Sequence, residues 1–168
     1  DDVIAGGKGN DIIDGSYGND TYIFNIGDGA DVVTDVSGTD SITFGAGITQ
    51  ADITLIPDYA NNYSLTIKIG NNGDQIRLNA FSYYGNSTWK IETLKFADGS
   101  SINLANGVTL LGTNVTGETL AGTDFNDTLT GNIGGDTINS WSGDDVIAGG
   151  KGNDIIDGSY GNDTYIFN

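Results

Sequence analysis

Carboxylates recur every nine residues along much of this chain, and this spacing is the strongest chemical signal in the sequence. From Thr113 the chain divides into six nonapeptides: TNVTGETLA, GTDFNDTLT, GNIGGDTIN, SWSGDDVIA, GGKGNDIID and GSYGNDTYI. The sixth residue of each is acidic, and these residues are Glu118, Asp127, Asp136, Asp145, Asp154 and Asp163. Ca²⁺ takes about six to eight oxygen ligands in flexible geometry, and Asp carboxylates suit it. The spacing therefore predicts a row of calcium sites rather than one reaction centre.

The same frame is present at the start of the chain. Asp11 and Asp20 are sixth residues there, and Asp31 and Asp40 are again nine apart after a slip of two residues. Glycine holds the fourth position of the last four nonapeptides, and the eighth residue is always Leu, Ile or Tyr. Glycines at the first and fourth positions allow turns that are closed to residues with a Cβ, and such turns can aim carbonyl oxygens inward.

These loops need short strands to position them. The three residues after each acid are expected to form a strand whose central side chain points into a core. Two nonapeptides would make one coil, and stacked coils lie about 4.8 Å apart. Aspartates on successive coils would then repel each other unless a cation separates them, so folding and calcium binding should be one event.

Composition excludes several classes of function. The 23 acidic and 6 basic residues give a net charge of −17, which disfavours nucleic acids and anionic membrane surfaces. The absence of Cys excludes disulfides and thiolate zinc sites, and the absence of His and Cys removes most acid–base and nucleophilic arrangements. We therefore expect no enzyme activity. No apolar run reaches membrane-spanning length, and Asp1 opens a fragment rather than a signal peptide.

A second, much longer period is present. Residues 1–25, DDVIAGGKGNDIIDGSYGNDTYIFN, recur without a change as residues 144–168. The variable positions match too, which nonapeptide similarity alone does not explain. The simplest interpretation is a tandem array with a 143-residue unit, although an engineered duplication would look the same.

Residues 45–112 have a different pattern. Alternation over 64–69 and 75–78 around the NNGD turn at 71–74 predicts a β-hairpin. Further short strands are expected at 52–56, 91–96 and 101–104. No long segment has helical periodicity, so the chain is expected to be all-β.

GGKGNDIID, at 149–157 and again at 6–14, matches the nonapeptide GGxGxDxUx of the RTX proteins, and residues 45–111 resemble the β-domain that accompanies haemolysin-type calcium repeats. The resemblance implies a right-handed parallel β-roll beside a small antiparallel β-domain. It divides the chain into roll segments at 1–44 and 113–168 and the antiparallel domain at 45–112.

The resemblance also implies several Ca²⁺ ions, held by sixth-position carboxylates and by loop carbonyls at the second and fourth positions. The carboxylates are Asp11, Asp20, Asp127, Asp136, Asp145, Asp154 and Asp163, with Asp31 and Asp40 as further candidates. The carbonyls are those of Gly7, Gly9, Ser16, Gly18, Thr123, Asn132, Gly134, Trp141, Gly143, Gly150, Gly152, Ser159 and Gly161.

Some residues depart from the pattern. Residues 113–121 have Thr113 and Thr116 where the pattern has glycine and Glu118 for Asp, and they are expected to cap the roll. Phe125 replaces a fourth-position glycine. Asp11 and Asp20 are expected to form half-built sites, because no coil precedes them. The aromatic segment 81–89, which ends in Trp89, is a weak candidate for stacking on a sugar.

The family resemblance implies secretion by a type I system and folding in extracellular calcium. The leading hypothesis for function is a structural unit of a tandem-array protein, such as an extracellular filament, surface layer or adhesin, that stacks on identical units. The alternative is a C-terminal folding and secretion module of an RTX toxin or secreted hydrolase.

Overall fold

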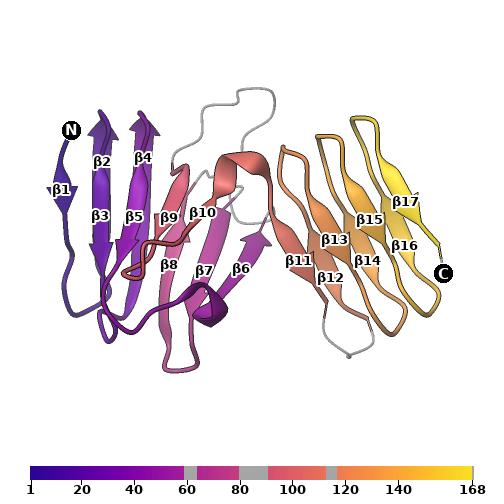
Figure 1. The fold of residues 1–168 in the computed structure, drawn as a ribbon, viewed down its shortest axis with the longest axis horizontal. Coiled ribbons are helices and arrows are strands. Elements are labelled where there is room, and N and C mark those ends of the chain that lie inside the picture. Colours follow the sequence, from indigo (N-terminus) through magenta and orange to yellow (C-terminus); the bar gives the residue numbers. More distant parts are fainter. Residues whose placement is uncertain (59–63, 80–90, 113–116, 168) are drawn as a thin grey trace. The chain divides into compact units, whose positions relative to one another are not determined.

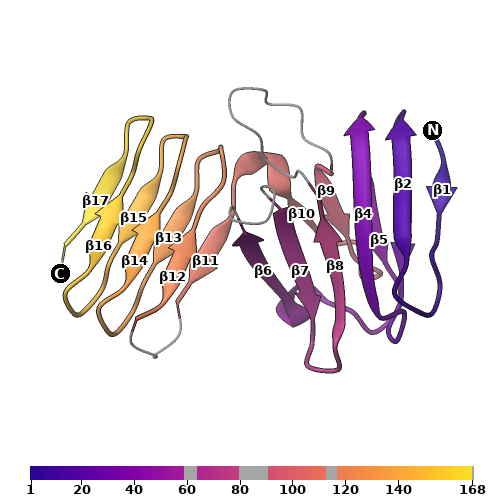
Figure 2. The ribbon, with the colours of Figure 1, turned by 180° about the vertical axis from the view of Figure 1, so that it is seen from behind.

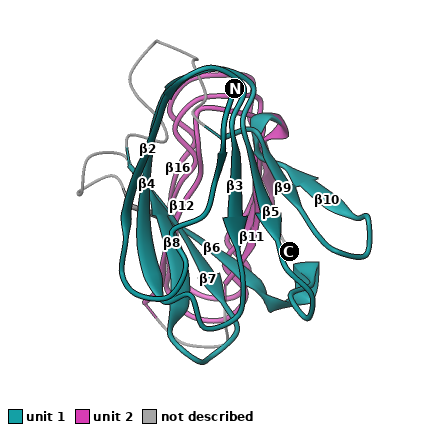
Figure 3. Cartoon of the chain, turned by 90° about the vertical axis from the view of Figure 1, so that its left-hand side faces the viewer, with its two compact units in different colours: residues 1–105 teal, residues 106–168 magenta. Residues whose placement is uncertain are grey.

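A computed structural model of the chain describes residues 1–58, 64–79, 91–112 and 117–167 (Figure 1). These residues form two compact units, Asp1–Ala105 and Asn106–Asn168 (Figure 3). Both are built from β-strands, and the described helical segments are two short 3₁₀ turns at Gln50–Asp52 and Leu104–Asn106. Within the described ranges, no helix has the length and apolar character needed to span a membrane.

The second unit is a β-roll of three-residue strands, which confirms the expected fold. Its two parallel sheets have the strand orders β11-β13-β15-β17 and β12-β14-β16. The strands are β11 (Thr109–Leu111), β12 (Thr119–Ala121), β13 (Thr128–Thr130), β14 (Thr137–Asn139), β15 (Val146–Ala148), β16 (Ile155–Asp157) and β17 (Thr164–Ile166). Ile138 pairs with Ile156 and Leu129 with Ile147, so one coil is two nonapeptides.

Eighth-position side chains form the core of this roll, as the pattern predicts. Leu129, Ile138 and Ile147 are fully buried, and Leu110, Leu120 and Ile156 pack against them. The residues on either side of each point away from this core, because side chains alternate along a strand. A three-residue strand therefore needs only one large apolar residue.

The first unit begins as the same roll but with a longer coil. Its strands are β1 (Val3–Ile4), β2 (Ile12–Tyr17), β3 (Thr21–Phe24), β4 (Ala30–Ser37), β5 (Ser41–Phe44), β6 (Ile53–Asp58), β7 (Ser64–Ile69), β8 (Asp74–Leu78), β9 (Thr93–Lys95) and β10 (Ser101–Asn103). Thr21 pairs with Ser41 and Ile12 with Val32, both twenty residues apart. The two-residue slip in the sequence thus lengthens the coil. The strands still pair in parallel, but the register between β2 and β4 shifts after Asp14.

The antiparallel strands continue the sheets of the roll. The sheet orders are β1-β3-β5-β9-β10 and β2-β4-β8-β7-β6, in which β8 pairs in parallel with β4 and antiparallel with β7 (Figure 2). The expected hairpin is confirmed, with Ile67 opposite Ile76. Strands from both sides of residue 45 share each sheet, and the division at 44 and 112 stays a prediction.

Candidate calcium sites

The sixth-position aspartates of the second unit form two ladders along the stack of coils. The Asp127 amide donates to Asp145 Oδ1 at 2.7 Å, and the Asp145 amide donates to Asp163 Oδ1 at 3.2 Å. On the other side of the roll, the Asp136 amide donates to Asp154 Oδ1 at 3.0 Å. Each carboxylate is therefore fixed by the backbone one coil earlier, through only one of its two oxygens.

The second carboxylate oxygen is the one available for a metal. Asp136 Oδ2 and Asp145 Oδ2 are buried and have no hydrogen-bond partner. Both side chains are 1% exposed. A buried ionised oxygen without a partner is strongly unfavourable. These hard, negatively charged oxygens therefore fit Ca²⁺, which would supply the missing interaction.

The backbone conformation of the loops places the expected carbonyl ligands. At the second position, Asn132, Trp141 and Ser159 have φ values of 77°, 71° and 54°, and Ser16 has 66° in the first unit. Gly7, Gly27 and Gly150 at the second position and all fourth-position glycines also have positive φ. The positive φ values thus fall at positions two and four, which are the positions whose carbonyls are the expected ligands.

The expectation that first-position glycines supply unusual backbone conformations is wrong. None of them has a positive φ in the described loops. They are needed because the sixth-position carboxylate folds back over them: a Cβ on Gly149 would lie 2.4 Å from Asp154 Oδ2, and one on Gly131 2.7 Å from Asp136 Oδ2. The reason for glycine at this position is therefore space rather than φ.

Asp127 differs from the other members of the ladder. Its carboxylate accepts hydrogen bonds from the Val108 amide and from both the amide and the hydroxyl of Thr123. Thr123 lacks the positive φ of the other second-position residues. In the loop that contains Phe125, Thr123 thus donates hydrogen bonds to the Asp127 carboxylate. Asp127, one of the predicted ligands, is therefore not left with a buried oxygen that lacks a partner.

The first unit has the same ladders with a different spacing. The Asp2 amide donates to Asp20 Oδ1 at 2.5 Å, the Asp20 amide to Asp40 Oδ1 at 2.6 Å, and the Asp11 amide to Asp31 Oδ1 at 2.9 Å. Asp11 Oδ2, Asp20 Oδ2 and Asp40 Oδ2 are buried without a partner. The ladders therefore include Asp31 and Asp40, although the nine-residue pattern is less regular around them.

The expectation that Asp20 lacks a preceding coil is wrong. β1 pairs with β3 in parallel, because Asp1 to Ile4 repeat the end of the nonapeptide SWSGDDVIA, and Asp2 is its sixth residue. Asp2 therefore holds the Asp20 carboxylate as Asp145 holds that of Asp163. In the other sheet no described strand of this chain precedes β2, and the site of Asp11 stays half-built.

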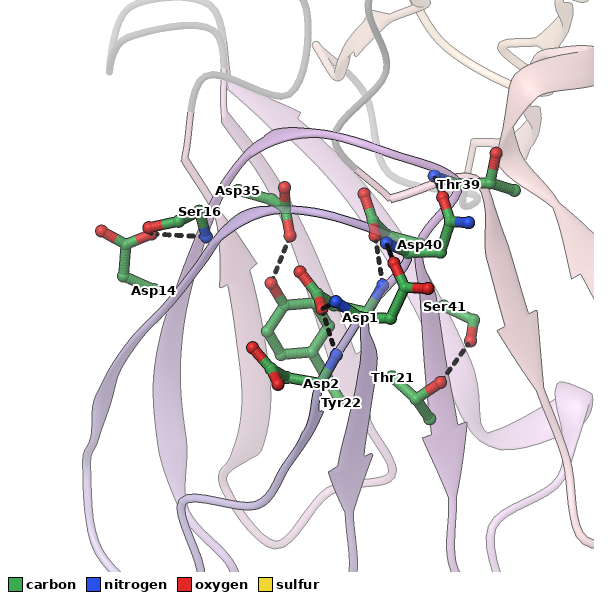
Figure 4. A network of polar contacts seen from close by, with 12 residues as sticks. Asp1, Asp2, Asp14, Ser16, Thr21, Tyr22, Asp35, Thr39, Asp40 and Ser41 are labelled. Carbon is green, nitrogen blue, oxygen red and sulfur yellow. Dashed lines mark hydrogen bonds and ion pairs between the residues drawn. The ribbon is translucent and has the colours of Figure 1, made fainter.

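Sequence reasoning missed three acidic residues of the first unit. Glu92 Oε2 accepts the Asp40 amide and extends the ladder. Asp74 accepts the amides of Gly27 and Gly29 at 2.7 and 3.2 Å. Asp35 lies beside Asp20 and Asp40. Figure 4 shows Asp35 and Asp40, and the hydrogen bond from Tyr22 to Asp35. Glu92 had one detectable signal, since it directly precedes strand β9 as Asp40 precedes β5.

A parallel β-roll with stacked, buried aspartates in glycine-rich loops defines a class of calcium-binding repeat protein. Comparisons with known families agree. The model of the RTX calcium-binding nonapeptide repeat matches residues 1–29, 114–147 and 142–168, which together make up half of the chain. The haemolysin-type calcium binding protein related domain matches residues 65–106. The chain belongs to the RTX calcium-binding repeat family, and it binds Ca²⁺ at several sites.

Other comparisons add little. No curated protein matches this chain. Among solved structures, the extracellular lipase LipA from Serratia marcescens matches with 20% sequence identity and a TM-score of 0.28. That match covers 94% of this chain but only 27% of the lipase chain, and a likeness this low carries no argument. The aromatic segment 81–89 lies outside the described residues, and so does the start of the first nonapeptide, 113–116.

Burial raises the pKa of several ladder carboxyls in the metal-free protein. It raises the pKa of Asp127 to about 7 and that of Asp40 to about 6, and it also raises the pKa values of Asp31 and Asp145. In each case burial outweighs the hydrogen bonds that favour the charged form. Without calcium, protonation of these carboxyls can thus remove part of the negative charge that the ions would otherwise neutralise.

Without calcium, the folded chain should therefore gain stability in mild acid. Because the folded pKa values of Asp127 and Asp40 exceed their unfolded values, folding takes up protons, and the stabilisation is lost as pH rises through about 6 to 7. Far-ultraviolet circular dichroism with a chelator should therefore show more strand signal near pH 5 than near pH 8. A strand signal independent of pH would contradict this.

Proposed function

We propose that this chain is a structural unit of a secreted tandem-array protein, in which successive units share one continuous calcium-filled β-roll. A filament, surface layer or adhesin is the kind of extracellular assembly that such an array would build. The support comes from the segment that occurs twice, 1–25 and 144–168. Each copy stacks on a different neighbour.

The two copies have the same internal structure. Val3 pairs with Thr21 as Val146 pairs with Thr164. The Asp2 amide donates to Asp20 as Asp145 donates to Asp163, and the Asn19 amide donates to Asp1 as Asn162 donates to Asp144. The segment therefore forms the same coil whether the chain continues before it or after it.

Each copy is covered only on the side where a neighbouring coil exists. Tyr22 and Phe24, which the following coil covers, are 2% and 3% exposed, whereas their counterparts Tyr165 and Phe167 are 43% and 84% exposed. On the opposite side, Val3 is 73% exposed and its counterpart Val146 is 36% exposed. In a tandem array a single segment would have both neighbours, so its Tyr and Phe would be as buried as Tyr22 and Phe24, and its Val would be no more exposed than Val146.

This observation carries the proposal. With β17 in the place of β3, one sheet would run β11-β13-β15-β17-β5-β9-β10, and the other would run β12-β14-β16-β4-β8-β7-β6. Repeat proteins that stack in this quasi-one-dimensional way suit extended fibres. An attached folding module of a toxin or hydrolase would not need the same coil to accept neighbours on both sides.

The ends of this chain are also complementary to each other. In the ladders, a sixth-position amide donates to the carboxylate one coil later, as those of Asp136 and Asp145 do, and the amides of Asp154 and Asp163 belong to the last coils of the chain. At the other end, the carboxylates of Asp2 and Asp11 have no earlier coil. We infer that calcium promotes end-to-end stacking of separate chains, with the last coil of one chain on the first coil of the next.

Catalysis is not part of this proposal. The chain has no His and no Cys, and most of the buried acidic residues among the described ones are sixth-position residues of the repeat. We propose an extracellular location, because a chain of charge −17 is held unfolded by its own repulsion until calcium is abundant. No activity is expected toward peptide, ester or glycosidic substrates.

The tandem proposal predicts how length grows with the number of units. A chain of residues 1–168 followed by 26–168 contains one complete junction. In calcium, small-angle X-ray scattering should give a rigid particle whose maximum dimension rises by a constant step with each further unit. The matched control replaces the shared segment at the junction with a flexible Gly-Ser linker of equal length, and should scatter as separate bodies. If both proteins scatter alike, the continuous roll is wrong.

Light scattering tests end-to-end stacking separately. Molar mass should increase as calcium is titrated into the metal-free chain of 168 residues. A compact monomer at saturating calcium would contradict stacking of separate chains. It would not contradict the covalent tandem array, which the small-angle X-ray scattering experiment tests.

A further inference from the structure

One loop of the first unit carries a carboxylate where the repeat has glycine. In the loop DVSGTD, Asp40 is the sixth residue and Asp35 is the first. The loop one coil earlier has Gly15 at this position, and the loops of the second unit have Gly122, Gly131, Ser140, Gly149 and Gly158. The repeat pattern therefore gives no reason for a carboxylate at residue 35.

The geometry of Gly15 makes room for this carboxylate. A Cβ on Gly15 would lie 2.7 Å from Asp35 Oδ2 and 3.0 Å from Asp20 Oδ2, and it would overlap the Tyr22 hydroxyl. The β2–β4 register shifts at this point, between Asp14 and Ser16. The bulge thus brings Asp35 over the first-position glycine of the earlier coil, toward Asp20.

Three carboxylates converge here, two of which, Asp35 and Asp40, are labelled in Figure 4. Asp20, Asp35 and Asp40 each offer one oxygen, and these oxygens lie within 4.8 Å of one another. The three side chains are 1%, 4% and 1% exposed. Asp20 Oδ2, Asp35 Oδ1 and Asp40 Oδ2 are each buried without a hydrogen-bond partner.

The other oxygen of each carboxylate is already held. Asp20 Oδ1 accepts the Asp2 amide, Asp40 Oδ1 accepts the Asp20 amide, and Asp35 Oδ2 accepts the Tyr22 hydroxyl. Tyr22 is itself 2% exposed, so its hydroxyl is fixed by the core. Each group is therefore oriented by one bond and leaves one oxygen for a common partner.

We propose that Asp20, Asp35 and Asp40 form a three-carboxylate calcium site that binds more tightly than the other coil sites of the chain and fills first. Elsewhere in the ladders, sixth-position aspartates one coil apart supply two carboxylates, as Asp136 and Asp154 do. Affinity for Ca²⁺ rises with the number of charged ligands and with the rigidity of the site. Asp35 adds the third charge, and Tyr22 positions it.

The test is equilibrium dialysis of the full chain against radioactive calcium in chelator-buffered solutions, which resolves classes of sites. Asp35→Asn should weaken the tightest class by on the order of 10–100-fold and leave the weaker classes unchanged. Asp98→Asn is the matched control, because Asp98 belongs to an exposed turn of the same unit outside the ladders, where it accepts the amide and hydroxyl of Ser100. It removes the same charge and should change nothing.

Two further variants keep the proposal testable if the Asp35→Asn protein does not fold. Asp35→Gly restores the residue of the repeat and should fold with an ordinary two-carboxylate site, again without the tight class. Tyr22→Phe should weaken the tight class less than Asp35→Asn does. If Asp35→Asn and Asp35→Gly both bind calcium in the tight class as the Asp98→Asn protein does, Asp35 is not a ligand and the proposal is overturned.

Discussion

Removing calcium from this chain with a chelator should abolish most of its β structure, and returning calcium should restore it. The ladders bury carboxylates on successive coils, and five of the sixth-position aspartates keep a buried oxygen without a partner: Asp11, Asp20, Asp40, Asp136 and Asp145. These charges repel one another in a chain of net charge −17 unless cations lie between them. Far-ultraviolet circular dichroism at neutral pH should show the loss of strand signal.

Two controls separate binding from screening. Magnesium should not restore the fold, because Mg²⁺ demands near-octahedral geometry and gives up its water reluctantly. Sodium chloride at high concentration should restore little, since it screens exposed charges better than buried ones. A chain that keeps its full strand signal in chelator would show that the ladders are stable without metal.

Replacing Gly29 by Ala should unfold the first unit or weaken it severely, whereas replacing Gly27 should not. Both glycines lie in the same loop and have positive φ, 106° and 84°. A Cβ on Gly29 would lie 2.0 Å from the Gly9 carbonyl oxygen of the preceding coil, but one on Gly27 would meet nothing within 4 Å. The two substitutions therefore differ mainly in whether coils can still stack.

The sizes of these effects follow from the two causes. Gly27→Ala carries only the left-handed conformation, about 1–2 kcal/mol of unfolding free energy. Gly29→Ala adds a clash with backbone that cannot move unless the coils separate, and should exceed about 3 kcal/mol. Thermal unfolding in saturating calcium measures both variants. Equal destabilisation would mean that close contact between coils does not limit this loop.

Calcium removal tests the carboxylate ladders, whereas the two glycine substitutions test the contact between coils. The carboxylate ladders determine when the chain can fold, because their repulsion must be neutralised. The fourth-position glycines determine how closely coils approach, and hence whether two aspartates one coil apart reach the same ion. A variant with intact aspartates and separated coils should therefore lose calcium affinity as well as stability.

The sequence by itself determined everything that repeats locally. The nine-residue frame identified the strands of the roll, their inward residues Leu129, Ile138 and Ile147, and the sixth-position aspartates of the ladders. The alternation at 64–69 and 75–78 identified the hairpin. These features depend on neighbouring residues and on a constant coil, so they can be read without knowing the path of the chain.

Only the tertiary structure decided what depends on contact between coils of unequal length. Asp40 meets Glu92 across 52 residues, and Asp35 reaches Asp20 because a bulge interrupts the pairing of β2 with β4. First-position glycines turned out to leave room for a carboxylate rather than to bend the backbone. A periodic pattern specifies each loop, but which oxygens share a site depends on how the loops stack, and insertions change that stacking without leaving a periodic trace.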